Sequence, residues 1–444
     1  MEFMLADALC CPRCAGALSA ADDGFACARC RTAYPLVGGI PCLVEDPALW
    51  RTLWLRRLDF YLSGVEMRVN ALQQEDPGAE LLPRTRKRVA RLAEGLATHF
   101  EKLRAFCQPL TAGADPFASE AIPPRAEPGQ QAAILECYEH LFRDWAWGTA
   151  ECETTAGLIA PLLPEKLARV AVLGAGTGRL AVDIHRQRGP AETFALDVNP
   201  FPFFVTARLL TGETVELPDL PTDPNSDEMV VVNEALSCPP GVPDGLSLLF
   251  ADALRPPFPA GSLDAVVTSW FIDVAQADVF KTAAVINRVL RPGGLWVNLG
   301  PLRFHADQSR AYTVEEVLDV AGACGFEILS RDSHQLPYFH SPSSGNWRSH
   351  RVFRFAARKQ AEAPAMEVAG PLPPWVTNPF LPIPVTPAMV ALGRMSVFTA
   401  GVLTLIDGER SILDLARQMG QSWNVDPSTL QDQLRAFFAQ LPSS

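Results

Sequence analysis

Short apolar runs alternate with helix-like patterns through the middle of the chain, between about residues 126 and 360. The apolar runs predict buried strands at 167–173, 193–196, 246–250, 265–269 and 295–299, and a final antiparallel pair at 327–330 and 351–356. Strands separated by helices are typical of a largely parallel sheet with helices on both faces. We therefore expect a Rossmann-like α/β domain over 126–360, closed by an antiparallel hairpin.

The regions on either side of this domain have different patterns. Residues 1–46 are rich in cysteine, and residues 47–125 repeat apolar side chains at helical spacing. Residues 361–384 are rich in proline, which indicates a semi-rigid linker. Residues 385–444 are mainly helical in pattern. We therefore expect a small cysteine-rich unit and a helical segment before the α/β domain, and a linker and a small helical domain after it.

The totals exclude several classes of protein. A chain of 444 residues is too long for one compact core, so two or more domains are expected. The net charge of −12 argues against a nucleic-acid partner, because such proteins present a basic surface. No apolar run reaches the roughly 18–20 residues of a membrane span, and no signal peptide is visible. We expect a cytoplasmic protein without a membrane partner.

Cysteines gather at the start of the chain, where five of the 11 fall within the first 30 residues. Two C-x-x-C pairs, Cys11 with Cys14 and Cys27 with Cys30, have the spacing that holds Zn²⁺ in a tetrahedral set of thiolates. Four protein ligands leave no open position, so the zinc would be structural and would supply much of the folding free energy. Cys10 could replace Cys11 as a ligand, and a set of free structural thiols is the alternative.

A glycine-rich turn follows the first predicted strand of the α/β domain. Gly174, Ala175, Gly176 and Gly178 stand between that strand and a helix. Glycine at these positions allows a tight turn and the close approach of a ligand to the backbone. The spacing is G-x-G-x-G and not the dinucleotide-binding G-x-G-x-x-G.

Acidic residues stand at the ends of the next two strands. Asp197 lies about 20 residues past the glycines, where a carboxylate can accept hydrogen bonds from both hydroxyls of a ribose. Asp252 follows the strand at 246–250 and is placed to accept a hydrogen bond from an adenine amino group. A plain turn acid is the alternative at both positions.

The stretch W-F-I-D places another acid, Asp273, just after the strand at 265–269. Asp273 could be the N-cap of a helix that begins near Val274, or its carboxylate could face a substrate. The second interpretation follows from the general rule that parallel sheets bind ligands at the carboxyl ends of their strands. Trp270 and Phe271 would then exclude water from the site.

The succession of glycine turn, strand-end acids and the L-R-P-G-G turn at 290–294 resembles the class I S-adenosylmethionine methyltransferases over about 200 residues. The resemblance implies S-adenosylmethionine as the cofactor, and an NAD-linked oxidoreductase is the alternative. The cysteine unit resembles the zinc ribbons that accompany methyltransferases, because residues 34–41 match their Y-P-x-x-x-G-I-P signature. In that family the ribbon supports a methyltransferase and does no chemistry itself.

Two segments resemble the carnosine N-methyltransferase family more narrowly. Residues 271–275 read F-I-D-V-A and residues 296–305 read W-V-N-L-G-P-L-R-F-H, where that family has F-F-I-D-T-A and W-I-N-L-G-P-L-x-Y-H. Upstream, R-D-W at 143–145 and C-P-P-G at 238–241 resemble its V-R-D-W and S-L-P-P-G segments. The resemblance spans about residues 135–358.

This resemblance implies roles on both sides of a site. Arg143 and Arg179 would hold the cofactor, with Arg179 near its carboxylate. Asp273 and His305 would face the imidazole of a histidine-containing dipeptide. An imidazole has a pKa of about 6.5, so its neutral form is available near pH 7. Asp273 could accept the N–H of one ring nitrogen and leave the other nitrogen facing the methyl group.

Three later positions bear on the identity of the substrate. Tyr338 falls where that family has a substrate tyrosine. The family's following Y-Y-Y stretch falls near Arg348, Ser349 and His350, so basic groups replace phenols in this chain. Arg348 would suit a substrate with an extra carboxylate, or a peptide.

Residues 385–444 carry a D-G-x-R-S turn at 407–411, followed by two amphipathic helical patterns. They resemble the small winged-helix domains that bind leader peptides in peptide-modifying pathways. The resemblance implies a leader-peptide or protein partner, and a packing or dimerising appendage is the alternative.

These observations predict an S-adenosylmethionine-dependent N-methyltransferase that acts on the imidazole of a histidine-containing small molecule or peptide. Methylation of another amine or of a hydroxyl is one alternative. A protein that binds the cofactor without turnover is the other.

Overall fold

The computed structural model describes residues 7–74, 82–112, 138–275, 278–304, 311–364, 381–384, 402, 405–423 and 426–439. Contacts divide the chain into two compact units. The first comprises Met1–Glu45, Tyr61–Pro109 and Pro128–Met366, and the second comprises Asp46–Phe60, Leu110–Glu127 and Glu367–Ser444. Each unit contains a hydrophobic core of its own.

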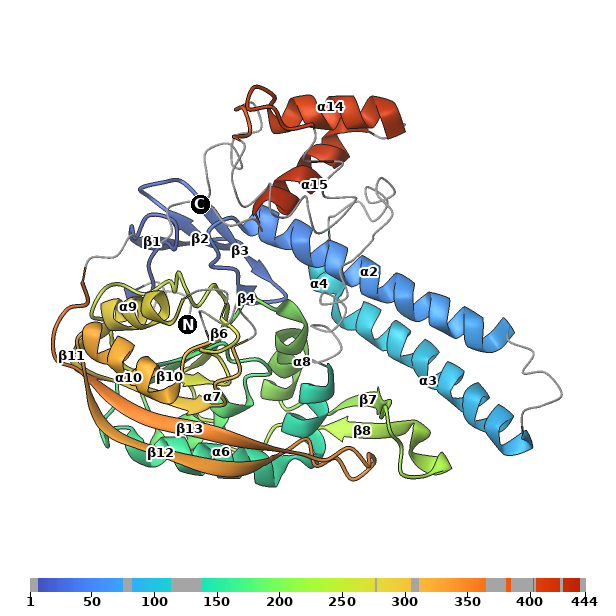
Figure 1. Cartoon of the computed structure of the whole chain (residues 1–444), viewed down its shortest axis with the longest axis horizontal. Helices are drawn as coiled ribbons and strands as arrows, with labels where there is room; N and C mark the ends of the chain where they lie inside the picture. Colours follow the sequence, from blue (N-terminus) through green and yellow to red (C-terminus); the bar gives the residue numbers. More distant parts are fainter. Residues whose placement is uncertain are drawn as a thin grey trace. The chain divides into compact units, whose positions relative to one another are not determined.

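The first unit is built on a seven-stranded sheet in the order β12-β13-β11-β10-β5-β6-β9 (Figure 1). Its strands are β5 (Arg169–Leu173), β6 (Glu192–Asp197), β9 (Leu246–Phe250), β10 (Leu263–Ser269), β11 (Leu290–Gly300), β12 (Phe326–Tyr338) and β13 (Arg348–Lys359). The neighbouring strands β11, β10, β5, β6 and β9 run parallel to one another. Strand β13 is antiparallel to both β11 and β12. This is the sheet predicted for a class I methyltransferase, so the predicted fold class is confirmed. The strand order reverses between β5 and β10, where such sheets bind ligands.

Helices cover both faces of the sheet (Figure 1). They are α6 (Thr149–Ile159), α7 (Arg179–Arg188), α8 (Pro200–Leu210), α9 (Val279–Val289) and α10 (Val314–Ala323). The same unit also contains two short 3-10 turns, η2 (Ala160–Leu162) and η3 (Asp227–Val230). Ala171 and Leu173 of β5 share a core with α9 and α10, whereas Val182 of α7 and Val205 of α8 belong to a second core. The central strands read as continuous apolar runs because both of their faces are buried.

Two features of the sheet region differ from the expectation. Strands β12 and β13 have 13 and 12 residues, far more than the predicted pair at 327–330 and 351–356. Exposed and half-buried side chains alternate along β12, so much of this strand has no apolar run to reveal it. The sequence pattern also does not predict the antiparallel hairpin of β7 (Val215–Asp219) and β8 (Val232–Leu236).

The cysteine-rich residues form a separate four-stranded antiparallel sheet. Its strands are β1 (Leu18–Ala21), β2 (Gly24–Cys27), β3 (Ala33–Val37) and β4 (Ile40–Pro41). After β4 the backbone follows the edge of the large sheet, where Cys42 pairs with Phe250 and the Leu43 N–H donates to the Phe250 carbonyl at 2.8 Å. Phe25 and Tyr34 enter the same core as β6 and β9. This cysteine-rich unit, which we call the ribbon, therefore covers the otherwise open edge of β9.

The remaining elements are helical. Within the segment predicted to be helical lie α2 (Pro47–Gln74), α3 (Pro83–Phe106) and α4 (Gln108–Thr111). The described part of the second unit includes α14 (Ile412–Trp423) and α15 (Pro427–Ala439), which pack through apolar side chains such as Leu415 and Leu434. The domain boundaries and the winged-helix assignment stay predictions. Among the described helices, none has the length and apolar character needed to cross a membrane.

Candidate active site

The loop between β5 and α7 is left-handed at each of its glycines. Gly174, Gly176 and Gly178 have φ values of 62°, 57° and 79°, which side chains with a Cβ rarely allow. A Cβ added to Gly174 would lie 2.3 Å from Cδ2 of Phe271. The glycines therefore permit both the tight turn and the close approach of the loop that follows β10.

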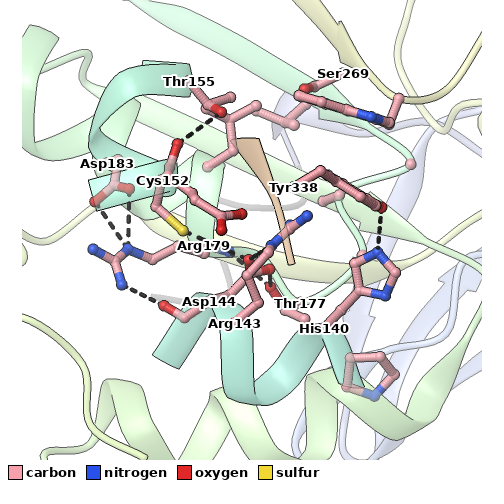
Figure 2. A pocket seen from close by; sticks show the side chains of 18 of the residues that line it. His140, Arg143, Asp144, Cys152, Thr155, Thr177, Arg179, Asp183, Ser269 and Tyr338 are labelled. Atoms are coloured by element: carbon pink, nitrogen blue, oxygen red, sulfur yellow. Dashed lines mark hydrogen bonds and ion pairs between the residues drawn. The ribbon is translucent and has the colours of Figure 1, made fainter. Parts of the chain in front are cut away.

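A cavity of about 340 Å³ opens at the carboxyl ends of β5 and β10, within the size range of small-molecule sites. The predicted residues that line it are Arg143, Gly174, Ala175, Gly176, Arg179, Trp270 and Tyr338. Figure 2 labels Arg143, Arg179 and Tyr338 among them. The predicted residues outside its lining are Gly178, Asp197, Asp252, Phe271, Asp273, Arg348 and His350. The cavity thus brings together residues predicted for the cofactor side and for the acceptor side.

The two acids predicted to bind a nucleoside lie at the carboxyl ends of neighbouring strands, because Asp197 is the last residue of β6 and Asp252 follows β9. Asp197 accepts hydrogen bonds from the N–H groups of Gly176 and Asn199, each at 2.8 Å. Burial raises the pKa of Asp197 to about 6, although these N–H groups act in the opposite direction. Asp252 accepts from the Leu254 N–H at 2.8 Å, and burial raises its pKa as well. Contacts of both acids with a cofactor stay a prediction.

A π-helical turn, η1 (Arg143–Trp147), brings charged side chains to the cavity. Such turns are frequent at functional sites. Asp144 is buried and accepts from Arg143 Nε at 2.6 Å and from the Thr177 hydroxyl of the glycine loop. Burial alone would raise the pKa of Asp144, but the Arg143 guanidinium and these hydrogen bonds hold it below its usual value. An ionised Asp144 therefore fastens η1 to the glycine loop.

The two arginines predicted to hold the cofactor have different surroundings. Arg179 is 4% exposed, and its Nε donates to the two carboxylate oxygens of Asp183 at 3.0 and 3.2 Å. Its Nη1 donates to the Asp144 carbonyl. Arg143 points into the cavity, with its guanidinium carbon 5.2 Å from the centroid of the Tyr338 ring (Figure 2). The geometry therefore favours Arg143 over Arg179 for direct contact with an anionic group.

Trp270 begins an aromatic wall directly after β10. Its φ is 48°, and its N–H donates to the Leu299 carbonyl at 2.9 Å. A Cβ at position 300 would lie 2.9 Å from the Trp270 nitrogen, so Gly300 permits this approach. The indole stacks on Tyr338 with centroids 5.8 Å apart and planes at 16°. The Tyr338 hydroxyl lies 3.0 Å from His140 Nε2, which ties the wall to the helix before η1.

Asp273 lies in the loop that follows β10 and is 7% exposed. Its Oδ2 accepts a hydrogen bond from the Arg303 N–H at 2.9 Å, so the carboxylate joins the loops after β10 and β11. Helix α9 begins only at Val279, and its N-cap is Asp278. The alternative in which Asp273 caps a helix near Val274 is therefore wrong.

His350 lies among charged groups at the start of β13. Its ring centroid is 4.5 Å from that of Tyr338, and its Nδ1 is buried with no hydrogen-bond partner among the described residues. Burial and the charges of Arg303 and Arg348 lower the pKa of His350, whereas the charge of Asp273 acts in the opposite direction. The His350 imidazole is therefore neutral near pH 7.

Sequence reasoning missed other residues of the cavity, including His140, Asp144 and Glu151. The R-D-W motif contains the signal for Asp144. No local pattern could reveal Glu151, because its hydrogen-bond partners lie 188 and 189 residues away along the chain. His305, predicted to face the acceptor, lies outside the described residues.

Four cysteine sulfurs converge in the ribbon, as predicted. The Sγ atoms of Cys11, Cys14, Cys27 and Cys30 all lie within 4.8 Å of one another. The Tyr34 hydroxyl lies 2.9 Å from the Sγ of Cys11, where it can donate to a thiolate. Four thiolates at this spacing fit a tetrahedral Zn²⁺ site. Cys10 is not part of the group, so the set given by the C-x-x-C spacing is the one that converges.

Comparison with known proteins bears on the acceptor side of this site. Residues 234–361 match the family model described as carnosine N-methyltransferase. This stretch of the chain is therefore similar to that family. It includes β10 to β13 and therefore Trp270, Asp273 and Tyr338.

Carnosine N-methyltransferases of other organisms are similar to parts of this chain that differ in length. Carnosine N-methyltransferase unmet of Drosophila melanogaster is 34% identical over 100 residues, which are 21% of this chain and 22% of that protein. The Rattus norvegicus carnosine N-methyltransferase is 32% identical over 97 residues, 21% of this chain and 24% of that protein. The Schizosaccharomyces pombe enzyme is 27% identical over 255 residues, 46% of this chain and 65% of that protein. Because this chain spans under a quarter of the fly and rat proteins, its activity is a proposal.

Solved structures of methyltransferases are similar to part of this chain only at low TM-scores. A complex between the Haloferax volcanii Trm112 methyltransferase activator and a methyltransferase matches with a TM-score of 0.37 and 18% identity, covering 53% of this chain and 98% of that chain. Geranyl diphosphate C-methyltransferase from Streptomyces coelicolor matches with a TM-score of 0.32 and 13% identity, covering 47% and 76%. Scores this low carry no conclusion about function, and the fold assignment rests on the strand order.

Proposed function

We propose that this protein transfers a methyl group from S-adenosylmethionine to an imidazole nitrogen of a histidine-containing small molecule or peptide. One observation carries the proposal. The segment that matches the carnosine N-methyltransferase family model supplies Trp270 and Tyr338, which line the same cavity as Arg143 and the glycine loop. A cofactor side and an acceptor side therefore adjoin in one cavity.

The donor would occupy the cavity beside the glycine loop. S-adenosylmethionine bound there would supply an electrophilic methyl group on its sulfonium, so the protein does not need to activate it. Arg143 would bind its carboxylate, and Asp197 would accept hydrogen bonds from its ribose. The fit is supported by the left-handed glycines and by the open space at Gly176, where an added Cβ would meet no atom within 4 Å.

Asp273 would orient the acceptor. Its carboxylate would accept the N–H of one ring nitrogen, which fixes the tautomer and directs the lone pair of the other nitrogen toward the cavity. Positive charge would develop on the ring as the N–C bond formed and the S–CH₃ bond of the donor broke, with S-adenosylhomocysteine as the leaving group. The carboxylate would stabilise that charge and accept the N–H proton of the ring. The Arg303 N–H already holds this carboxylate in place, so positioning needs little rearrangement.

Basic residues near His350 favour an acceptor that carries negative charge. Arg303 and Arg348 have exposed side chains, and both charges act on His350. An arginine fork binds a carboxylate through two parallel hydrogen bonds. A histidine derivative with an additional carboxylate, or a peptide, therefore suits this site better than carnosine itself.

Transfer of a labelled methyl group to a panel of acceptors tests the proposal. The panel contains carnosine, aspartyl-histidine, its side-chain amide asparaginyl-histidine and longer histidine-containing peptides, with an amine and an alcohol of similar size as controls. We expect label only in imidazole acceptors, and faster transfer to aspartyl-histidine, which has one carboxylate more than carnosine, than to its amide. Label in the amine or alcohol with unlabelled imidazoles would overturn the proposal, and cofactor binding without any transfer would indicate a binding protein.

We also propose functions for the two ends of the chain. The four cysteines would hold a structural zinc ion, because four thiolates leave no position for a substrate. Residues 385–444 would bind a leader peptide or another protein, a proposal that rests on the D-G-x-R-S turn and the two helices that follow it.

A further inference from the structure

Glu151, in the first turn of α6, holds the backbone just after β12 through two hydrogen bonds. Its Oε2 accepts from the Phe339 N–H at 3.2 Å, and its Oε1 accepts from the His340 N–H at 2.8 Å. Glu151 also lines the cavity, together with Tyr338. One carboxylate therefore connects α6 to the backbone that follows Tyr338.

The backbone that Glu151 holds has an unusual conformation. Phe339 has a φ of 58°, in the left-handed region that residues other than glycine avoid. A left-handed residue in a turn can direct successive N–H groups to the same side and form a concave site for an anion. The Glu151 carboxylate fills this site. Without it, two N–H groups would lose their partner beside a strained residue, so the conformation depends on the carboxylate.

The contacts of Tyr338 depend on the same stretch of backbone. Its ring stacks on Trp270 at 5.8 Å and lies 4.5 Å from the ring of His350, centroid to centroid. The guanidinium carbon of Arg143 lies 5.2 Å from its centroid, and its hydroxyl lies 3.0 Å from His140 Nε2. The Phe339 ring is a further contact, with its centroid 4.7 Å from that of Tyr338, so a change of φ at Phe339 would disturb the packing of Tyr338.

We propose that Glu151 is a positioning residue for methyl transfer, whose carboxylate holds the backbone after Tyr338 and thereby keeps that ring in place as a wall of the acceptor site. The inference rests on the proposed methyltransferase function and extends it. Glu151 lies outside the 234–361 segment that matches the carnosine N-methyltransferase family model, so the rest of the chain would help to shape the acceptor side.

Steady-state kinetics of Glu151→Gln, with calorimetric titration of S-adenosylmethionine, test the inference. Glutamine keeps the length of the side chain but offers one acceptor oxygen to two N–H groups and carries no charge. We expect the acceptor KM to rise about tenfold, with kcat changed less than about threefold and the cofactor Kd less than about twofold. Glu153→Gln, at an exposed position of the same helix, is the matched control and should behave like the wild type.

Phe339→Gly gives a second test, because glycine adopts this φ without strain and keeps the backbone N–H. In that background Glu151→Gln should raise the acceptor KM less than about threefold. An unchanged KM in Glu151→Gln would overturn the inference. An equal rise in the cofactor Kd would also overturn it, because the carboxylate would then bind the cofactor.

The variant and the wild type are compared in acceptor KM, kcat and cofactor Kd with whichever acceptor the wild type methylates. Turnover of an amine or alcohol would therefore defeat the imidazole proposal and leave the role of Glu151 open to the same test. If no acceptor is turned over, hydrogen exchange decides. We expect the Phe339 and His340 amides to exchange faster in Glu151→Gln than in Glu153→Gln, and equal rates would overturn the inference.

Discussion

The carboxylate of Asp197 lies beside the glycine loop and accepts a hydrogen bond from the Gly176 N–H. Burial raises its pKa to about 6, whereas an aspartate in an unfolded chain has a pKa of about 3.9. Between these values the folded protein binds more protons than the unfolded chain, so the stability contributed by Asp197 decreases as the pH rises toward 6. Binding of the ribose hydroxyls needs the ionised carboxylate of Asp197. A rise in pH that lowers the stability of the folded protein therefore favours cofactor binding.

We therefore expect the affinity for S-adenosylmethionine to fall as the pH drops through the pKa of Asp197. Binding coupled to one proton should raise the Kd about tenfold per pH unit below about pH 6. Asp197→Asn should bind the cofactor more weakly and without this dependence. Calorimetric titrations between about pH 5 and 8 check the prediction, and equal slopes in the two proteins would rule out the assigned role.

Asp273→Asn should lower kcat for an imidazole acceptor by about 10²- to 10⁴-fold, because an amide stabilises developing positive charge poorly. Asparagine can still accept from the Arg303 N–H, so folding and cofactor binding should be retained. Asp278→Asn is the matched control, since asparagine is an equally good N-cap for α9. Stopped assays of labelled methyl transfer measure both variants. A kcat for Asp273→Asn within about threefold of the wild type would refute the role of the carboxylate.

Sequence patterns located Asp273 but not the groups around it. The strand-end position and the F-I-D motif single out this acid, whereas its partner, the Arg303 N–H, lies 30 residues further along the chain. The supporting residues Asp144 and Glu151 are fixed by contacts between distant segments, which have no periodicity in the sequence. Local patterns therefore predicted the candidate acids and missed the residues that hold the site in shape.

Among the elements, the buried central strands were the most predictable. Strands β5, β6, β9 and β10 are buried on both faces and appear as apolar runs, so their predicted bounds lie within a few residues of the observed ones. Strand β12 alternates exposed and half-buried side chains, and the hairpin of β7 and β8 carries Glu216 and Glu234. Polar edge elements of this kind have no apolar signal, which explains why they were not predicted.

Asp219 gives the β7–β8 hairpin a pH-dependent stability. It ends β7, is 8% exposed, and has a pKa raised to about 7 by burial and by the charges of Glu234 and Glu139. A carboxyl pKa raised above its unfolded value means that ionisation destabilises the folded state as the pH rises toward 7. Asp219→Asn should therefore raise the melting temperature by a few degrees at about pH 8 and much less at about pH 5.

Thermal unfolding at the two pH values measures this effect. Asp223→Asn, at an exposed position of the segment that connects β7 to β8, is the control and should leave both melting temperatures unchanged. Equal shifts for Asp219→Asn at the two pH values would show that the gain comes from packing and not from titration.

At the scale of the whole molecule, the ribbon and the large sheet share one hydrophobic core. Cys27→Ser should remove most of the expected zinc, about one ion per chain, whereas Cys10→Ser should retain it because that sulfur is outside the group of four. Loss of the metal should also loosen β9, since the Leu43 N–H donates to the Phe250 carbonyl on that edge. Elemental analysis and hydrogen exchange over 246–250 measure the two effects. Zinc retained in Cys27→Ser would disprove the site, and faster exchange confined to the ribbon would disprove the coupling.

The position of the transferred methyl group tests the central claim most directly. The intact protein is incubated with S-adenosylmethionine labelled in its methyl group and with a histidine-containing peptide that also has a free amine and a hydroxyl. Fragmentation mass spectrometry and NMR then locate the label. We expect label on a ring nitrogen of the histidine, and label on the amine or the hydroxyl would show that the acceptor is not an imidazole.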